Sequence, residues 1–371
     1  MGTITRGLAN SITTGGKVVS TSLSGTVAAP NVNNESLDSV TAFSSSLGDF
    51  VETRASDLSA SPTTRGQLFY NSTAGALKGI RLGTASWASG GSLPAGRQNA
   101  GQAGTQTAAI LAGGQPPSTY NTNTSYTYDG SSWTSTPNLG TERREANMFG
   151  IQTAAVLAAS TKDNPRSYLT ASEEWNGSSW TAGGAINTGR QGAFGGGTLT
   201  QGVIAGGSGP SYSNATEEYD GSSWTTVTNM PAAQGNGTSG ADSQLDMSCV
   251  GGGPGTQTTH AIYNGTSWSA GNSLSGAGRR GNRGAMPSSS SLGFTAGGES
   301  ATVNPITVTE EWNGTSFSSS TAIPAATRDA ASSDGGTGEA GLFSGGNTGS
   351  ITANTFEWTG SQQTLKTITT A

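Results

Sequence analysis

Cysteine and histidine, two residue types that build many catalytic and metal centres, are nearly missing from this sequence. Among 371 residues there is one cysteine, Cys249, and one histidine, His260. A single cysteine cannot form an internal disulfide bond, and a single histidine cannot supply a histidine metal cluster. We therefore expect a protein without a bound metal or other cofactor.

Charge is also scarce. Charged residues make up 11% of the chain, against about 25% in an average globular domain. The 17 basic residues are outnumbered by 23 acidic ones, which gives a formal net charge of −6 and no lysine-rich run. This balance argues against a protein that binds nucleic acid through its phosphates.

Long apolar runs are absent as well. No stretch reaches the roughly 18–20 residues of a membrane helix. The first residues, MGTITRGLANSITTGG, lack the apolar core of about 7–15 residues that a secretion signal carries. We expect a soluble protein made without export, which fits either a cytoplasmic protein or a component of a virus particle.

An internal repeat organises the chain. Five copies of one pattern occur: an aromatic residue, Asp or Asn, Gly, Ser or Thr, Ser, and a second aromatic residue. The second aromatic residues are Trp133, Trp180, Trp224, Trp268 and Phe317, and the glycines are Gly130, Gly177, Gly221, Gly265 and Gly314. Trp87 lies 46 residues before the first copy, and a degenerate sixth copy surrounds Trp358.

A second landmark has nearly the same period. Apolar segments such as TQTAAILAGG recur, and their ends are separated by 46, 47, 46, 45 and 48 residues. These ends are Gly114, Ser160, Gly207, Gly253, Gly298 and Gly346. A fixed period of this size is typical of repeat architectures, so we expect six units between about residues 97 and 363.

The residues of one unit predict short antiparallel strands. AAILAGG is too brief for a helix and ends in two glycines, as a buried strand does. Asp-Gly and Asn-Gly favour tight hairpin turns. Such a unit cannot bury its apolar face alone, whereas radial closure would protect its edges. We therefore predict an all-β protein, a β-propeller of six blades, or of seven if residues 66–86 form another blade.

These elements, followed by SLPAGR at Ser92 to Arg97, resemble the kelch repeat of kelch-type propellers. The resemblance covers about residues 84–363, although Ser160 replaces a glycine in the second unit. It implies that a strand from one end of the chain completes a blade at the other end. The segment around Trp87 is the expected closing strand of the last blade.

The amino-acid sequences of the repeats, such as ATEEYDGSSW, also resemble those of kelch-like arrays in structural proteins of tailed bacteriophages, especially marine phages. RGQLFYNSTAGALK, at Arg65 to Lys78, is similar to a hairpin that recurs in phage tail fibres. The resemblance implies a virion protein present in multiple copies and displayed on the tail, where it would adhere to a glycan or protein of the host surface. Alternatives are a capsid decoration protein, a cellular kelch-type scaffold for protein binding, and a carbohydrate-active propeller enzyme.

Two domains are expected, an N-terminal arm at residues 1–83 and the propeller at residues 84–371. Apolar residues from Leu37 to Val51 follow helical spacing, so an amphipathic helix is predicted at residues 36–51. One hypothesis is that residues 1–60 anchor the protein to other virion proteins. The alternative is a helix that packs across the base of the propeller.

Paired glutamates precede the hairpin aromatics in three units. The pairs are Glu173 and Glu174, Glu217 and Glu218, and Glu310 and Glu311. Adjacent residues of a strand point to opposite faces, which suits glycosidase carboxylates poorly; catalysis or calcium coordination is the alternative interpretation. We interpret these glutamates as solvated strand positions and predict a protein that is not an enzyme, with no catalytic or metal-binding residue.

Arginines also recur in register. Arg97, Arg143 and Arg190 each lie 17 residues before their landmark, where the fourth unit has Asn236; the later units have Arg279, Arg280 and Arg328 nearby. We expect these arginines to donate hydrogen bonds to backbone carbonyls that join blades; the alternative is a ring that binds anionic sugars. His260 is expected on a strand surface and Cys249 in the core. No particular binding residue is predicted.

Overall fold

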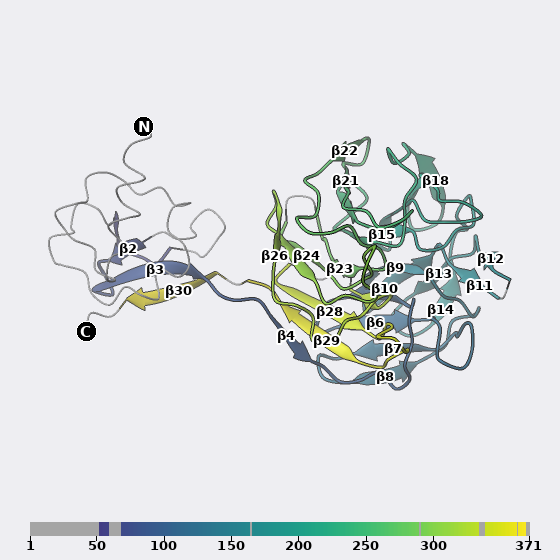
Figure 1. Ribbon diagram of the computed structural model, residues 1–371, viewed down its shortest axis with the longest axis horizontal. Helices are drawn as coiled ribbons and strands as arrows, with labels where there is room; N and C mark the ends of the chain where they lie inside the picture. The colour runs from purple at the N-terminus through teal and green to yellow at the C-terminus, as the bar shows by residue number, and fades with distance from the viewer. Residues whose placement is uncertain are drawn as a thin grey trace. The chain divides into compact units, whose positions relative to one another are not determined.

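The computed structural model describes residues 52–58, 68–163, 165–288, 291–333, 338–361 and 363–368. The helix predicted at residues 36–51 lies outside these residues. Within them the structure contains thirty strands and no helix, and so no helix long and apolar enough to cross a membrane. The chain divides into two compact units, Met1–Thr84 with Ser361–Ala371, and Ala85–Gly360 (Figure 1).

The smaller unit contains one four-stranded sheet made from both ends of the chain. Its strands, in sheet order, are β1 (Glu52–Arg54), β2 (Leu68–Asn71), β3 (Ala76–Leu82) and β30 (Gln363–Ile368). β2 and β3 form an antiparallel hairpin, and β3 pairs with β30. Residues 361–371, which the sequence analysis assigned to the propeller, thus group with the N-terminal unit.

The larger unit is a six-bladed β-propeller, and each blade is a four-stranded antiparallel sheet. Blade 1 has β5 (Gly101–Gly104), β6 (Ala109–Ala112), β7 (Ser125–Tyr128) and β8 (Trp133–Thr136). Blade 2 has β9 (Asn147–Ile151), β10 (Ala154–Ala158), β13 (Glu173–Trp175) and β14 (Trp180–Ala182), and carries a small hairpin of β11 (Thr161–Lys162) and β12 (Ser167–Tyr168). Blade 3 has β15 (Phe194–Thr198), β16 (Gln201–Ala205), β17 (Thr216–Tyr219) and β18 (Trp224–Val227).

The remaining blades repeat this order. Blade 4 has β19 (Thr238–Ala241), β20 (Met247–Val250), β21 (His260–Tyr263) and β22 (Trp268–Ala270). Blade 5 has β23 (Arg283–Ala285), β24 (Gly293–Ala296), β25 (Thr309–Trp312) and β26 (Phe317–Ser319). Blade 6 has β27 (Ala331–Ser332), β28 (Ala340–Ser344), β29 (Thr355–Thr359) and β4 (Ser86–Ser89).

The ring closes in two ways. The innermost strands β5, β9, β15, β19, β23 and β27 contact one another in turn, and β27 contacts β5. In blade 6, β4 pairs with β29, and Trp87 lies opposite Trp358 with ring centroids 5.0 Å apart. The prediction that the segment around Trp87 completes the last blade is confirmed.

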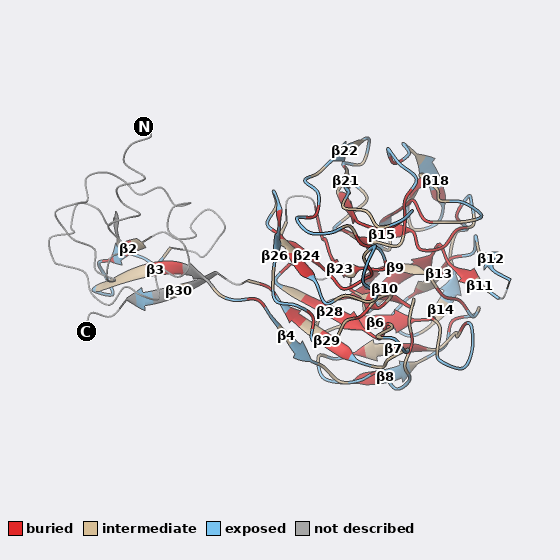
Figure 2. Ribbon diagram, in the orientation of Figure 1, coloured by how far each residue is buried: buried red, intermediate tan, exposed pale blue. Residues whose placement is uncertain are grey.

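The strands differ in burial according to their place in the blade. All four residues of β5 and of β6 are buried, whereas three of the four residues of β4 are exposed (Figure 2). Small residues allow the inner strands to approach closely: a Cβ added to Gly196 would lie 2.3 Å from the backbone nitrogen of Ala241 in the next blade. The glycine content of the sequence therefore has a packing role as well as a turn role.

The hairpin turns have the expected chemistry. Asp129 Oδ1 accepts hydrogen bonds from the backbone nitrogens of Ser131 and Ser132, each at 2.8 Å. The bond from Ser132 contributes most to holding the pKa of Asp129 at about 2. The repeat glycines of these turns have φ between +84° and +95°, the left-handed region that favours glycine: Gly130, Gly177, Gly221, Gly265 and Gly314.

The repeat aromatics connect neighbouring blades. Trp133 Nε1 donates to Thr355 Oγ1 of blade 6 at 3.0 Å, and Trp180 Nε1 donates to Ser125 Oγ of blade 1 at 3.2 Å. Trp133, Trp224 and Phe317 are buried, while Trp87, Trp180 and Trp268 are partly buried. The first aromatic of each pattern lies deeper, since Tyr128, Trp175, Tyr219, Tyr263, Trp312 and Trp358 are at most 3% exposed.

We predict that Trp133→Ala and Trp224→Ala each lower the free energy of unfolding by about 3–5 kcal/mol, because each removes a buried indole between two blades. Chemical denaturation of the full chain measures this loss. Trp180→Ala is the matched control and should cost less, because that indole is only partly buried. Unchanged stability of Trp133→Ala and Trp224→Ala would contradict the packing role.

Candidate functional site

The first glutamate of each pair is buried in an ion pair. Arg143 Nη2 lies 2.5 Å from Glu173 Oε1, and Arg190 Nη1 lies 2.5 Å from Glu217 Oε1. The third pair joins Arg279 and Glu310. The prediction that these three glutamates are solvated is therefore wrong. Each carboxylate faces the interior and is compensated by an arginine that precedes it by about 30 residues.

The other three blades lack this charged pair: blade 1 keeps the arginine and replaces only the glutamate, whereas blades 4 and 6 replace both residues. In blade 1 the guanidinium of Arg97 lies 4.5 Å from the ring centre of Tyr126. In blade 4 the arginine position is occupied by Gln234 rather than by the predicted Asn236, and Ala261 replaces the glutamate. Blade 6 has Thr327 and Phe356 at these positions. The buried glutamate thus occurs only where the arginine is also present.

The buried arginines also bind backbone carbonyls, but the expectation that these bonds join blades is wrong. Arg97 Nη1 donates to the carbonyl of Gly113 at 3.0 Å and to that of Thr124 at 3.3 Å. Arg143 Nη1 donates to the carbonyl of Ala171 at 2.9 Å. These acceptors lie in the same blade rather than in a neighbouring one. The arginines therefore stabilise individual blades and are not exposed to a ligand.

The second glutamate of two pairs joins neighbouring blades through a tyrosine. Tyr263 Oη donates to Glu218 Oε1 at 2.9 Å, and Tyr219 donates to Glu174. Glu357 accepts the same bond from Tyr128 at 2.6 Å between blades 6 and 1. Burial and these carboxylates raise the pKa of Tyr128 and of Tyr219 to about 12. These glutamates therefore also have structural partners.

The innermost part of the propeller contains a closed ring of backbone hydrogen bonds. One residue per blade has a left-handed conformation, with φ between +51° and +63°. Its N–H donates to the carbonyl of the equivalent residue in the preceding blade, over distances of 2.7–2.9 Å. We call these six residues the floor ring: Asn99, Glu145, Gly192, Asn236, Gly281 and Asp329. The N–H of Asn99 donates to the carbonyl of Asp329 and completes the circle.

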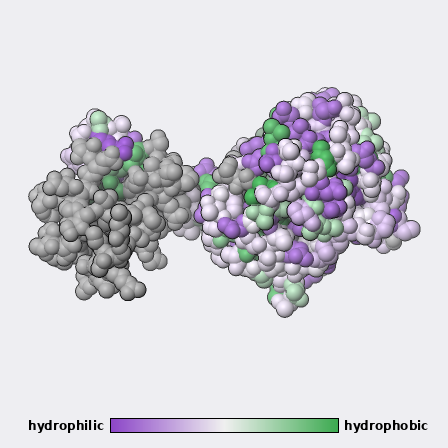
Figure 3. Space-filling view, turned by 90° about the horizontal axis from the view of Figure 1, so that it is seen from above, coloured by the Kyte–Doolittle hydropathy of each residue, from purple (hydrophilic) through white to green (hydrophobic). Residues whose placement is uncertain are grey.

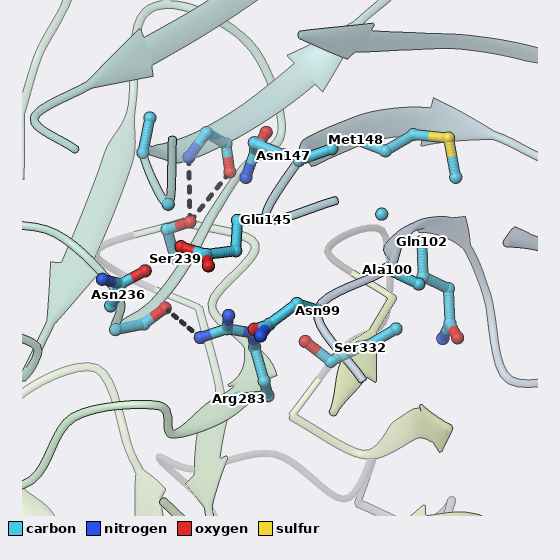
Figure 4. Close-up of a pocket in the computed structure, with 17 residues that line it drawn as sticks. Asn99, Ala100, Gln102, Glu145, Asn147, Met148, Asn236, Ser239, Arg283 and Ser332 are labelled. Carbon is cyan, nitrogen blue, oxygen red and sulfur yellow. Dashed lines mark hydrogen bonds between the residues drawn. The ribbon is translucent and has the colours of Figure 1, made fainter. Parts of the chain in front are cut away.

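A small cavity of about 50 Å³ lies on one side of the floor ring and is lined by all six blades. Figure 4 shows the side chains of Glu145 and Arg283 projecting into this space. Arg283 donates to the carbonyls of Asn282 at 2.9 Å and Gly237 at 3.3 Å. Burial lowers the pKa of Arg283 and raises the pKa values of Glu145 and Asp329.

A larger cavity of about 530 Å³, which we call the mouth, lies on the other side of the floor ring. The residue directly before the floor-ring position lines the mouth in five blades, together with later loop residues, whereas residues directly after the ring position line the small cavity in blades 1 to 4. Four arginines and three acids meet there: Arg144, Arg166, Arg280, Arg328, Glu145, Glu299 and Asp329. Gln98, Gln115, Gln191, Ser208, Ser211 and Tyr212 add uncharged polar groups.

Most of the charges at the mouth are paired. Arg166 Nη2 lies 3.0 Å from Glu145 Oε1, Arg328 Nη1 lies 2.9 Å from Asp329 Oδ2, and Arg280 pairs with Glu299. Arg144 has a different environment: its Nη1 donates to Gln115 Oε1 at 3.0 Å, and its guanidinium lies 5.4 Å from the ring centre of Tyr120. The arrangement presents donors and acceptors side by side.

The single histidine and the single cysteine are both interior. His260 is 2% exposed, its Nε2 lies 3.1 Å from Ser248 Oγ, and its ring meets that of Trp312 edge to face. The prediction of a surface position for His260 is therefore wrong. Cys249 is fully buried, which confirms its predicted place in the core. Among the described residues no group of three or more His, Cys, Asp or Glu side chains could hold a metal ion.

Sequence reasoning identified only two of the four arginines of the mouth, Arg280 and Arg328, as part of a ring of recurring arginines. Arg144 and Arg166 have no equivalent at the 17-residue spacing that singled out Arg97. Arg280 and Arg328 were noted, but only as neighbours of the periodic position. A signal that could have located four of the six floor-ring residues is the position two places after each buried arginine; in blades 4 and 6 Gln234 and Thr327 stand in the arginine's place.

Comparison with known proteins supports the fold. No protein-family model matches the sequence. No curated protein matches it either. Among solved structures, "Structure of YjhT" is similar with a TM-score of 0.60, 13% sequence identity and coverage of 74% of this chain and 98% of that chain. At this identity the likeness concerns the fold alone.

The buried ion pairs predict that the stability effects of substituting the arginine and its glutamate depend on each other. We predict that Arg190→Gln lowers the free energy of unfolding by about 3–5 kcal/mol, because it leaves the buried Glu217 carboxylate without its cation. The double variant with Glu217→Ala reproduces the Gln234 and Ala261 pair of blade 4 and should be more stable than the single variant. Denaturant titration measures both; a further additive loss in the double variant would contradict the pairing.

His260 makes stability depend on pH. Burial lowers its pKa to about 4, from about 6.5 in an unfolded chain. Between these values the unfolded chain binds the proton more readily, so this residue destabilises the fold as the pH falls from 6.5 towards 4. At pH 5 the effect is about 2 kcal/mol relative to pH 7.

We expect His260→Thr, which copies Thr216 and Thr309 of other blades, to lose that part of the pH dependence. Unfolding free energies of both proteins at pH 7 and pH 5 measure the difference, and the pH 7 values account for any packing loss. If the unfolding free energy changed equally between pH 7 and pH 5 in the two proteins, His260 would not titrate in this way.

Proposed function

We propose that this protein is a non-catalytic component of a tailed-phage particle, in which a kelch-like propeller is displayed on the tail and binds the host surface. The kelch-like repeats and the Arg65 to Lys78 segment, similar to a tail-fibre hairpin, support the phage origin. The observation that carries the binding role is the mouth, a cavity of about 530 Å³ rich in arginine and other polar side chains.

The burial of the periodic acids favours binding over hydrolysis. A glycosidase needs two carboxylates that face one bond across about 5–10 Å. Glu173, Glu217 and Glu310 are instead held in buried ion pairs. Glu174 and Glu218 accept hydrogen bonds from tyrosines of the next blade. The repeated carboxylates are thus committed to the fold.

The surface of the propeller is consistent with a ligand recognised through polar contacts. Weakly polar residues cover most of the visible face, and the hydrophobic ones form only small scattered groups (Figure 3). Exposed large apolar side chains such as Tyr120, Ile151 and Leu245 lie in different blades. A polar mouth therefore accounts for binding better than an apolar docking patch does.

Labelling of intact particles tests the proposal. Gold-coupled antibodies against the propeller should decorate the tail in electron micrographs of purified phage. Decoration of the head would instead favour a capsid decoration protein. Absence of the protein from purified particles would contradict the virion assignment and favour a cellular kelch-type scaffold.

We further predict that deletion of residues 1–60 yields a folded propeller that no longer joins the particle. The reason is that the propeller ring is built entirely from residues 85–360, so its own contacts survive the deletion. Thermal melting should show the propeller transition within about 3 °C of the full chain, since the deletion keeps every strand of the propeller. Normal incorporation into particles would refute the anchoring role.

A further inference from the structure

We propose that the ligand of the mouth is an acidic glycan, a chain of sugars that carry carboxylate groups. This inference rests on the binding role proposed above and specifies its ligand class. It draws on the arginines that line the mouth, on polar atoms there without a partner, and on the acids that share the same cavity.

The blade fold does not require the arginines of the mouth. Arg144, Arg280 and Arg328 occupy one equivalent bridge position of blades 2, 5 and 6. Blades 1 and 3 have Gln98 and Gln191 there, and blade 4 has a glycine. The blade therefore folds without arginine at this position. By contrast, the buried arginine one residue earlier in the chain always contacts a specific side chain: a glutamate in blades 2, 3 and 5, and Tyr126 in blade 1.

The arginines lie on two sides of the mouth. Arg144 and Arg166 belong to blade 2, while Arg280 and Arg328 come from the loops that lead into blades 5 and 6. Blades 2 and 5 stand opposite each other in a six-bladed ring. The Arg166 and Arg280 side chains are each 47% exposed, so both can turn towards a ligand. A chain of sugars could therefore contact guanidinium groups at both ends of the cavity.

Two buried polar atoms of the mouth lack a partner. Arg144 is 6% exposed and its Nε makes no hydrogen bond, while Gln191 is 2% exposed and its Oε1 makes none. One atom is a donor and the other an acceptor. Buried groups of this kind are costly unless something binds them. Both atoms have almost no accessible surface, so a ligand contacts them only when these side chains turn towards the cavity; its carboxylates would then accept from Arg144 and its hydroxyls would donate to Gln191.

The acids of the mouth limit the possible class of ligand further. Four arginines and three acids leave a net charge of about +1 in the cavity, within a chain whose net charge is −6. This net positive charge is too small for tight binding of a phosphate polymer, because such binding depends on many unpaired lysines or arginines. Glu299 and Asp329 can instead accept hydrogen bonds from sugar hydroxyls. The arginine fork matches the planar geometry of a carboxylate.

The floor ring makes the site rigid before a ligand arrives. Glu145 and Asp329 belong to the ring, and their backbone is fixed by hydrogen bonds to the preceding and following blades. Tyr212 lines the cavity, and Tyr120, 51% exposed, lies beside Arg144, so aromatic faces are available for sugar rings. A rigid site spends less binding free energy on ordering its side chains and loops.

Calorimetric titration of the full chain tests this inference. The probes are oligomers of galacturonate, of hyaluronate and of alginate, with methyl-esterified oligogalacturonate as the neutral counterpart. At least one acidic oligomer should bind, and the ester should bind at least about tenfold more weakly because it has no negative charge and cannot form a bidentate ion pair with arginine. Short-chain polyphosphate should compete poorly.

Matched variants locate the site. Arg144→Gln and Arg280→Gln copy the glutamines of blades 1 and 3 and should each weaken binding about tenfold while the melting temperature is kept. Lys162→Gln removes the same charge from β11 outside the mouth and should leave the affinity unchanged. Failure of all three acidic oligomers to bind, equal binding of the ester, or full affinity in both arginine variants would overturn the inference. Labelling of particles is independent, so a labelled tail with no acidic-glycan binding would reject only the ligand class.

Discussion

Contact between neighbouring blades is the interaction on which the rest of this structure depends. A single four-stranded blade leaves its apolar faces uncovered, and only the next blade covers them. Three kinds of contact recur at the interfaces: the repeat aromatics, the tyrosine–glutamate hydrogen bonds and the backbone bonds of the floor ring. Because β4 completes blade 6, the last interface is closed by a segment that precedes blade 1 in the chain.

Much of the ring could be predicted from the sequence because its signals are local. The Asp-Gly and Asn-Gly turns, the buried segments before them and the period of about 46 residues are all visible in the sequence. Trp87 could be assigned to the closing strand because it extends the series of aromatics by one period. Cys249 lay within an apolar segment, and the structure buries it.

Other features depended on partners far away in the chain and could not be predicted in this way. Glu173 looked solvated because a glutamate on a strand usually is, but Arg143 lies 30 residues earlier and compensates its charge in the interior. His260 looked exposed because serine or threonine has the same position elsewhere, yet its ring packs against Trp312 of the next blade. The floor ring was missed because its members share a backbone conformation and not a residue type.

The same ring connects fold and function. Its left-handed residues separate the small inner cavity from the mouth, and two of them, Glu145 and Asp329, contribute carboxylates to the mouth. The arginines of the mouth are distinct from the buried arginines that stabilise the blades, such as Arg143 and Arg190. The propeller thus provides a frame in which the residues of the mouth differ from blade to blade while the fold is kept.

Hydrogen exchange at the amides of the floor ring tests the closed ring most directly. The account predicts that the amides of Asn99, Glu145, Gly192, Asn236, Gly281 and Asp329 exchange only through global unfolding, and all at similar rates. The decisive amide is that of Asn99, whose bond to Asp329 joins the first blade to the last. An Asn99 amide that exchanges far faster than the other five would show an open ring and contradict the account.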